Sequence, residues 1–88
     1  MLRLQKNIER TTNDITIPAV IRENWGTSYD VLDGDGKIII RPGDTYKIQK
    51  KCKLYIPIEL TDKYGKQVYM IFGDGTTNIY LEPTSKEE

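Results

Sequence analysis

This sequence of 88 residues contains no histidine, a single cysteine and no long apolar run. Without histidine, the chain has no side chain whose ordinary pKa lies near neutral pH, which argues against acid–base catalysis. Cys52 alone cannot form an intrachain disulfide, and it has no histidine partner to activate it as a nucleophile. We therefore expect a protein that is not an enzyme and that needs neither a cofactor nor a metal.

The sequence also has no excess of positive or negative charge, because 13 basic residues balance 13 acidic ones. This balance argues against a polycation made for nucleic acid. No apolar run reaches transmembrane length, and the first ten residues, MLRLQKNIER, lack the apolar centre of a signal peptide. These absences predict a cytoplasmic protein.

What the sequence does contain is a repeat with a period of 39 residues. Residues 15–42 read ITIPAVIRENWGTSYDVLDGDGKIIIRP, and residues 54–83 read LYIPIELTDKYGKQVYMIFGDGTTNIYLEP. One copy alone is near the size at which a chain needs a partner to fold, so the copies are predicted to be halves of one core. The expected divisions are a single domain 1–88, a first repeat 1–42, a second repeat 43–83 and a short polar tail 84–88.

Each repeat predicts the order strand, strand, short helix, strand, strand. In both copies a proline follows an alternating strand and suits the start of a helix, and a glycine follows where the helix should end. Asp-Gly between two strand-forming runs is a strong hairpin signal. The expected strands are 2–8, 14–17, 29–32, 37–41, 45–48, 54–56, 68–72 and 77–81, and the expected helices are 19–25 and 57–64.

Apolar side chains at equivalent places in the two copies predict the core. The expected core residues are Ile17, Pro18, Ile21, Trp25, Ile56, Pro57, Leu60 and Tyr64. Trp25 and Tyr64 would alternatively be exposed platforms on which nucleic-acid bases stack. Their places one helical turn after Ile21 and Leu60 favour burial instead.

The string Asp33-Gly-Asp-Gly has the beginning of a calcium-binding loop. Such a loop needs an oxygen ligand at its fifth position and glycine at its sixth. Counted from Asp33, these positions hold Lys37 and Ile38. The string therefore predicts a hairpin turn and no metal site.

The string Ile-Thr-Ile-Pro-x-x-Ile-Arg-Glu at 15–23, with Gly26 and the hairpin segment 35–42, resembles the AbrB/MazE/SpoVT swapped-hairpin family. The segment 56–60 of the second copy is similar to it as well, and the resemblance covers about 8–42 and 45–83. It implies a mainly β fold, an AbrB-like barrel that most members build from two chains that exchange hairpins. Two β-β-α-β-β repeats in one chain, each with one short helix, imply a monomeric pseudo-dimer, with further dimerisation left open.

Many members of this family are DNA-binding regulators, or antitoxins that repress their own operon. The resemblance places their DNA contacts on basic residues in the loop before the second strand and on the outer helix surface. In this sequence those places hold Arg10, Arg22, Lys50, Lys51 and Lys53, whereas Asp14 and Glu23 stand at two places that are commonly basic. The first hypothesis is therefore a transcriptional regulator that binds double-stranded DNA through an asymmetric basic face.

The alternative hypothesis is a protein-binding module, antitoxin-like or of another kind, on the same barrel with little affinity for DNA. The balanced charge fits this alternative better. The lysines of segment 47–53 would then belong to a solvated loop or a strand edge.

Overall fold

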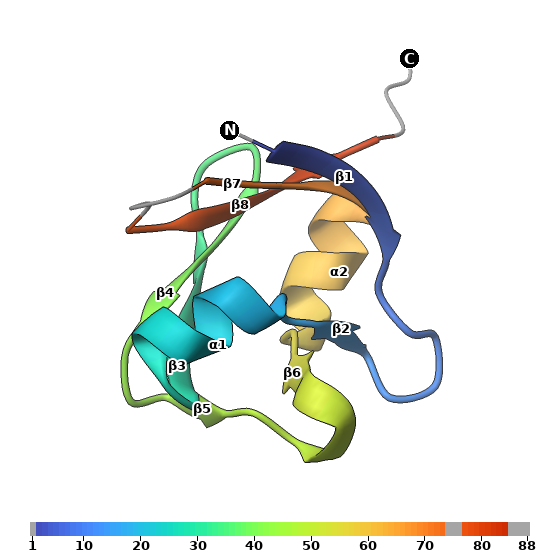
Figure 1. Cartoon of the computed structure of the whole chain (residues 1–88). Coiled ribbons are helices and arrows are strands. Elements are labelled where there is room, and N and C mark those ends of the chain that lie inside the picture. The colour runs from blue at the N-terminus through green and yellow to red at the C-terminus, as the bar shows by residue number, and fades with distance from the viewer. Residues whose placement is uncertain (1, 74–76, 85–88) are drawn as a thin grey trace.

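The structure is a computed structural model that describes residues 2–73 and 77–84, and it is mainly β with two short helices (Figure 1). The predicted tip of the second hairpin (74–76) and the tail residues 85–88 lie outside the described residues. No helix in the described ranges is long and apolar enough to cross a membrane. In chain order the elements are β1 (Leu2–Asn7), β2 (Asp14–Thr16), α1 (Ala19–Trp25), β3 (Ser28–Asp33), β4 (Ile38–Pro42), β5 (Tyr46–Lys47), the 3-10 helix η1 (Lys50–Cys52), β6 (Lys53–Tyr55), α2 (Ile58–Tyr64), β7 (Gln67–Phe72) and β8 (Ile79–Pro83).

The two α-helices begin and end in the same way. Pro18 and Pro57 stand immediately before them, with φ of −58° and −54°. Gly26 and Gly65 follow them with φ of 83° and 87°, and each glycine N–H donates to the carbonyl four residues earlier. Because L side chains rarely adopt this φ, glycine ends each helix at the predicted residue.

The first hairpin has the predicted turn. The Gly34 N–H donates to the Lys37 carbonyl over 2.7 Å, and the residues between them, Asp35 and Gly36, have φ of 60° and 110°. Positive φ at both central positions is the type I′ geometry that matches the twist of an antiparallel pair. The turn therefore sets the register of β3 on β4, in which Asp33 lies opposite Ile38.

Both sheets contain strands from the two repeats. The six-stranded antiparallel sheet has the order β1-β7-β8-β4-β3-β5, so the first strand of each repeat lies on the hairpin of the other repeat. The two exchanges are equivalent: the Ile8 N–H donates to the Lys66 carbonyl over 2.7 Å, and the Ile48 N–H donates to the Thr27 carbonyl over 2.9 Å. β2 and β6 form a separate two-stranded sheet.

Two of the strand pairs are centred on residues that occupy the same place in each repeat. In β2–β6, Ile15 lies opposite Leu54, and in β4–β8, Ile39 lies opposite Tyr80. A residue that faces its own counterpart in an antiparallel pair marks a local twofold axis. The chain therefore has an internal twofold arrangement that passes through both pairs.

The core lies between the two sheets and the helices. Its buried apolar residues are Ile8, Ile15, Ile17, Ile21, Tyr29, Val31, Ile38, Ile40, Leu54, Ile56, Leu60, Val68, Met70, Phe72, Ile79 and Leu81.

Four of the predicted core residues are among them, but Trp25 and Tyr64 are only partly buried and pack against the margin of the core. The Tyr64 hydroxyl stays outside because it bonds to a carboxylate, and Trp25 packs beside Tyr29 with 6.0 Å between ring centroids. The prolines Pro18 and Pro57 are half-buried. Trp25, Tyr64 and the two prolines therefore lie at the margin of the core and not inside it as predicted.

The tether between the repeats, residues 42–45, is pinned by one side chain. Asp30 Oδ1 accepts hydrogen bonds from the Asp44 N–H (3.2 Å), the Thr45 N–H (3.2 Å) and the Thr45 hydroxyl (2.7 Å). The bond from the Thr45 hydroxyl is the main cause that lowers the pKa of Asp30. Gly43 packs so closely that an added Cβ would lie 2.1 Å from the carboxyl carbon of Asp30. The tether is therefore a fixed turn that connects β4 to β5.

Two isoleucines on either side of Pro57 test this description of the core. Ile56 is fully buried and Ile58 is 54% exposed. We expect Ile56→Ala to lower the free energy of unfolding by about 2–5 kcal/mol, because it leaves a cavity. The control Ile58→Ala should change it by less than about 0.5 kcal/mol. Urea unfolding followed by tryptophan fluorescence measures both, and equal losses would contradict the assignment.

Candidate nucleic-acid interface

The predicted basic residues come from two loops and one helix. The β1–β2 loop carries Arg10, η1 carries Lys50 and Lys51, β6 begins with Lys53, and Arg22 lies on α1. Figure 1 shows both loops beside the β2–β6 pair, at the end of the molecule away from β7 and β8. The side chain of Lys50 lies outside what the structure describes.

A left-handed residue ends each of these loops. Asn13 has φ of 54° and its counterpart Cys52 has φ of 62°. The Asn13 carbonyl accepts from the Ile56 N–H (2.8 Å), and the Cys52 carbonyl accepts from the Ile17 N–H (3.0 Å). Each loop is thereby fixed to the strand–helix junction of the other repeat, which places loop residues of one repeat beside the helix of the other.

An open hollow of about 400 Å³ lies where η1 meets α1. Its lining residues are Arg22, Glu23, Gly26, Thr27, Ile48, Gln49, Lys51 and Cys52. Arg22 Nε donates to the Ile17 carbonyl over 3.2 Å, which anchors the side chain and leaves its terminal nitrogens available. Neither Arg22 nor Lys51 forms an ion pair with any residue that the structure describes. The hollow thus combines an anchored guanidinium with a lysine from the other repeat, and it also contains the carboxylate of Glu23.

The corresponding place in the other half is closed. There Asn13 Nδ2 donates to the Ile56 carbonyl (2.6 Å) and to Thr61 Oγ1 (3.2 Å), and Asn13 and Thr61 are 5% and 4% exposed. Thr61 is the counterpart of Arg22, and Asn13 is the counterpart of Cys52. The same backbone site therefore holds a buried neutral pair in one half and an open cationic hollow in the other.

The remaining predicted residues lie outside this hollow. Arg10 is exposed on the β1–β2 loop, where its carbonyl accepts from Lys66 Nζ over 3.4 Å. Lys53 Nζ lies 3.7 Å from Glu9 Oε2, so its charge is partly offset. The structure therefore brings Arg22 and Lys51 together, leaves Arg10 on the neighbouring loop and pairs Lys53 with an acid.

An acidic residue lies in the middle of this end of the molecule. A second hollow, of about 480 Å³, is lined by Thr12, Asp14, Gln49 and Tyr55. Gln49 lines both hollows, so they are neighbours. Asp14 is buried, and its Oδ1 has no hydrogen-bond partner among the described residues. Because a carboxylate repels phosphate, the basic surface is divided by Asp14.

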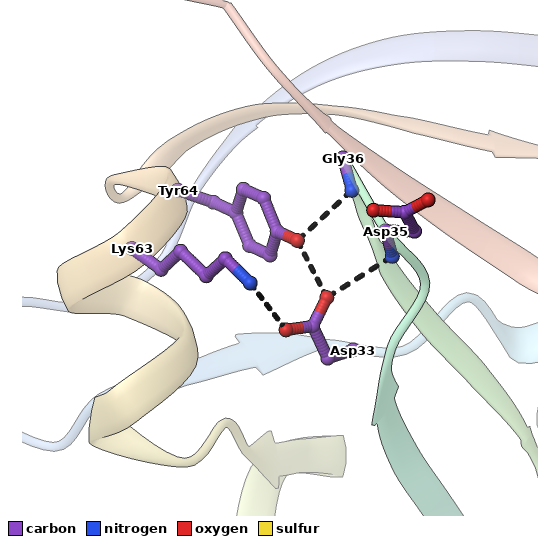
Figure 2. A network of polar contacts seen from close by, with 5 residues as sticks. All are labelled: Asp33, Asp35, Gly36, Lys63 and Tyr64. Atoms are coloured by element: carbon purple, nitrogen blue, oxygen red, sulfur yellow. Dashed lines mark hydrogen bonds and ion pairs between the residues drawn. The ribbon is translucent and has the colours of Figure 1, made fainter.

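A titratable group with a strongly lowered pKa, Asp33, lies elsewhere, in a network at the first hairpin turn (Figure 2). The Tyr64 hydroxyl donates to Asp33 Oδ1 (2.5 Å) and accepts from the Gly36 N–H (2.9 Å). Lys63 Nζ donates to Asp33 Oδ2 (2.7 Å), and the Asp35 N–H donates to Asp33 Oδ1 (3.0 Å). These hydrogen bonds, that from Lys63 first, lower the pKa of Asp33 to about 2.

This network fastens α2 of the second repeat to the β3–β4 turn of the first. Asp33 and Lys63 are exposed and Tyr64 is half-buried, and each oxygen of the Asp33 carboxylate already has a partner. It is therefore a clasp between the two repeats. The sequence predicts a turn at Asp33 and favours a buried Tyr64, but it does not indicate that they meet, because the contact joins residues 31 positions apart.

In the described ranges no group of three or more cysteine, aspartate or glutamate side chains is arranged to hold a metal ion. Cys52 is a half-buried free thiol at the rim of the cationic hollow. No family model, curated protein or solved structure matches this chain.

The clasp predicts an acid-sensitive component of stability. The pKa of Asp33 is about 2 in the folded chain and about 3.8 when unpaired, so the folded state favours the carboxylate. This contribution is complete above about pH 4 and is lost as the pH falls towards 2. We expect Asp33→Asn to lower stability at pH 7 and to flatten the loss between pH 4 and 2, measured by urea unfolding at each pH.

Asp35→Asn is the matched control, because the same substitution in the same turn leaves the carboxylate of the clasp intact. This variant should keep the pH dependence of the parent between pH 4 and 2. An Asp33→Asn protein whose stability falls as steeply as that of the parent in this window would contradict the role of the clasp.

Proposed function

We propose that this protein is a DNA-binding transcriptional regulator, built as a single-chain pseudo-dimer of the AbrB-like swapped-hairpin type. The exchange of β1 and β5 between the repeats supports this architecture. So does the twofold arrangement of β2–β6 and β4–β8, since a homodimer would place identical strands across its axis in the same way.

The observation that carries the proposal is the convergence of Arg22 and Lys51, one from each repeat, on one open hollow. A guanidinium offers paired N–H donors that match a phosphate, and an ammonium adds a compact charge beside it. Neutralising phosphates with such residues releases counterions and provides much of the affinity of DNA-binding proteins. The hollow is therefore proposed to hold one phosphate of the DNA backbone.

We infer unequal roles for the two loops. Arg10 is exposed on the β1–β2 loop and is proposed to contact a neighbouring phosphate. Asp14 excludes phosphate from the middle of the surface, and Glu9 weakens the contribution of Lys53. We infer an asymmetric contact with double-stranded DNA, with Arg22 and Lys51 as its strongest part.

A protein-binding module remains the second candidate, favoured by a separate observation. Two leucines of β1, Leu2 and Leu4, are 54% and 39% exposed. They lie on a sheet that is otherwise well packed, and the net charge of zero does not oppose such a role.

Binding to a duplex of mixed sequence at two salt concentrations tests the first candidate. We expect a fluorescence-anisotropy titration of the whole chain to show binding at low salt that weakens as salt rises. The double variant Arg22→Ala/Lys51→Ala should bind at least about tenfold more weakly and should reduce the slope of log K against log salt by about 1–2.

Lys37→Ala is the control variant. It removes one positive charge next to the β3–β4 turn, at the opposite end of the molecule in Figure 1. Its affinity should be close to that of the parent. Absence of binding to any duplex at low salt, or an equal loss in Lys37→Ala and the double variant, would refute the proposal.

A further inference from the structure

The hollow that contains Asp14 lies on the face of the β2–β6 pair that points away from the core. Asp14 lies opposite Tyr55 in this pair, and the next residue, Ile15, is buried in the core. Because side chains alternate along a strand, Asp14 and Tyr55 share the outer face. Thr12 and Gln49, from the two loops beside the pair, complete the lining of this hollow of about 480 Å³. Both repeats therefore contribute to it.

Asp14 is an acid without a counter-charge. The residue is 9% exposed, and its Oδ1 has no hydrogen-bond partner among the described residues. No lysine or arginine in the described part of the chain forms an ion pair with it. A buried carboxylate oxygen that loses its water without gaining a partner is unfavourable. Asp14 therefore marks this hollow as a place for a cationic hydrogen-bond donor.

The equivalent place in the other half shows which kind of donor this is. The Glu9 N–H donates to the Asp14 carbonyl (2.8 Å) and the Gln49 N–H donates to the Lys53 carbonyl (2.6 Å), so these two pairs of residues are counterparts. Lys53 Nζ forms an ion pair with Glu9 Oε2 over 3.7 Å. In the hollow, Asp14 takes the place of Lys53, and Gln49 takes the place of Glu9. An ammonium with its carboxylate in one half thus corresponds to a carboxylate beside a neutral amide in the other.

We propose that this hollow binds a primary ammonium group, which pairs with the Asp14 carboxylate against the ring of Tyr55. A small amine or a lysine side chain carries such a group, and it is charged at neutral pH. Tyr55 is 37% exposed and packs against Tyr46 with 6.0 Å between ring centroids, and the face of an aromatic ring attracts a cation. This proposal goes beyond DNA binding and does not depend on it.

Other cations fit this hollow less well. A guanidinium pairs best with both oxygens of a carboxylate, whereas Oδ1 of Asp14 is buried, so a compact ammonium is the better match. Calcium and magnesium prefer a full shell of oxygen ligands. The lining of the hollow has one carboxylate, beside the side chains of Thr12, Gln49 and Tyr55. The single charge of Asp14 therefore matches a single ammonium.

The test titrates butylammonium chloride into the isotope-labelled whole chain at constant ionic strength and follows the NMR spectrum. We expect saturable shift changes at Asp14, Gln49 and Tyr55 at millimolar concentration. Asp14→Asn keeps the shape of the side chain but removes its charge, and it should bind at least about tenfold more weakly, because a hydrogen bond to a charged group contributes at least this factor. Methylguanidinium should bind the parent more weakly than butylammonium does.

Glu9→Gln is the matched control. It removes one negative charge from the same end of the molecule, in the ion pair that is the counterpart of the proposed site. This variant should bind butylammonium as the parent does.

A capped glycine–lysine–glycine peptide distinguishes the two sources of the ammonium. Tighter binding of the peptide than of butylammonium would assign the hollow to a lysine side chain, and equal or weaker binding would assign it to a small amine.

Three results would overturn the proposal: no saturable shift changes at millimolar butylammonium, equal binding of methylguanidinium, or an Asp14→Asn variant that binds as well as the parent or loses no more than Glu9→Gln does. The variant Arg22→Ala/Lys51→Ala separates this test from that of DNA binding. It should still bind butylammonium, whereas its affinity for DNA should fall.

Discussion

Backbone pairing between the two repeats joins the layers of this structure. In four pairs, β1 on β7, β5 on β3, β2 on β6 and β4 on β8, one strand comes from each repeat. A repeat alone would keep only the pairing within its own hairpin, β3–β4 or β7–β8. Its other strands would have no partner, although buried backbone groups need one. The tether turns the meeting of two halves into an intramolecular step, so the paired form persists at any dilution. The core, both loops and the cationic hollow all depend on this pairing.

The same pairing explains how a symmetric backbone carries an asymmetric surface. Each loop ends on the strand–helix junction of the other repeat, so each helix faces a loop that can change independently of its own repeat. In one half, Asn13 and Thr61 fill this junction with a neutral hydrogen bond. In the other, Cys52 and Arg22 leave it open beside Lys51. A homodimer would have two identical junctions, whereas in a single chain one junction can be closed and the other open.

Much of the fold could be predicted from local patterns, because prolines, glycines and the Asp-Gly turn act within a few residues. The helix limits and the first hairpin turn follow from such signals. The site depends on contacts between distant residues. That Arg22 meets Lys51 rather than Arg10 is set by the exchange of strands and by a left-handed residue before β6, which no local pattern specifies. The prediction of Tyr64 as a core residue misses its contact with Asp33 because Asp33 lies in the other repeat, and no local pattern indicates a contact between repeats.

Joining two repeats in one chain has a geometric consequence for the sheet edges. A twofold pair of chains has two identical edge strands, and each needs the same protection from unwanted pairing. In a single chain, the tether must occupy the position before β5, and Asp30 holds it there as a turn. β5 is therefore limited to two residues, whereas β1 has six residues and its exposed leucines.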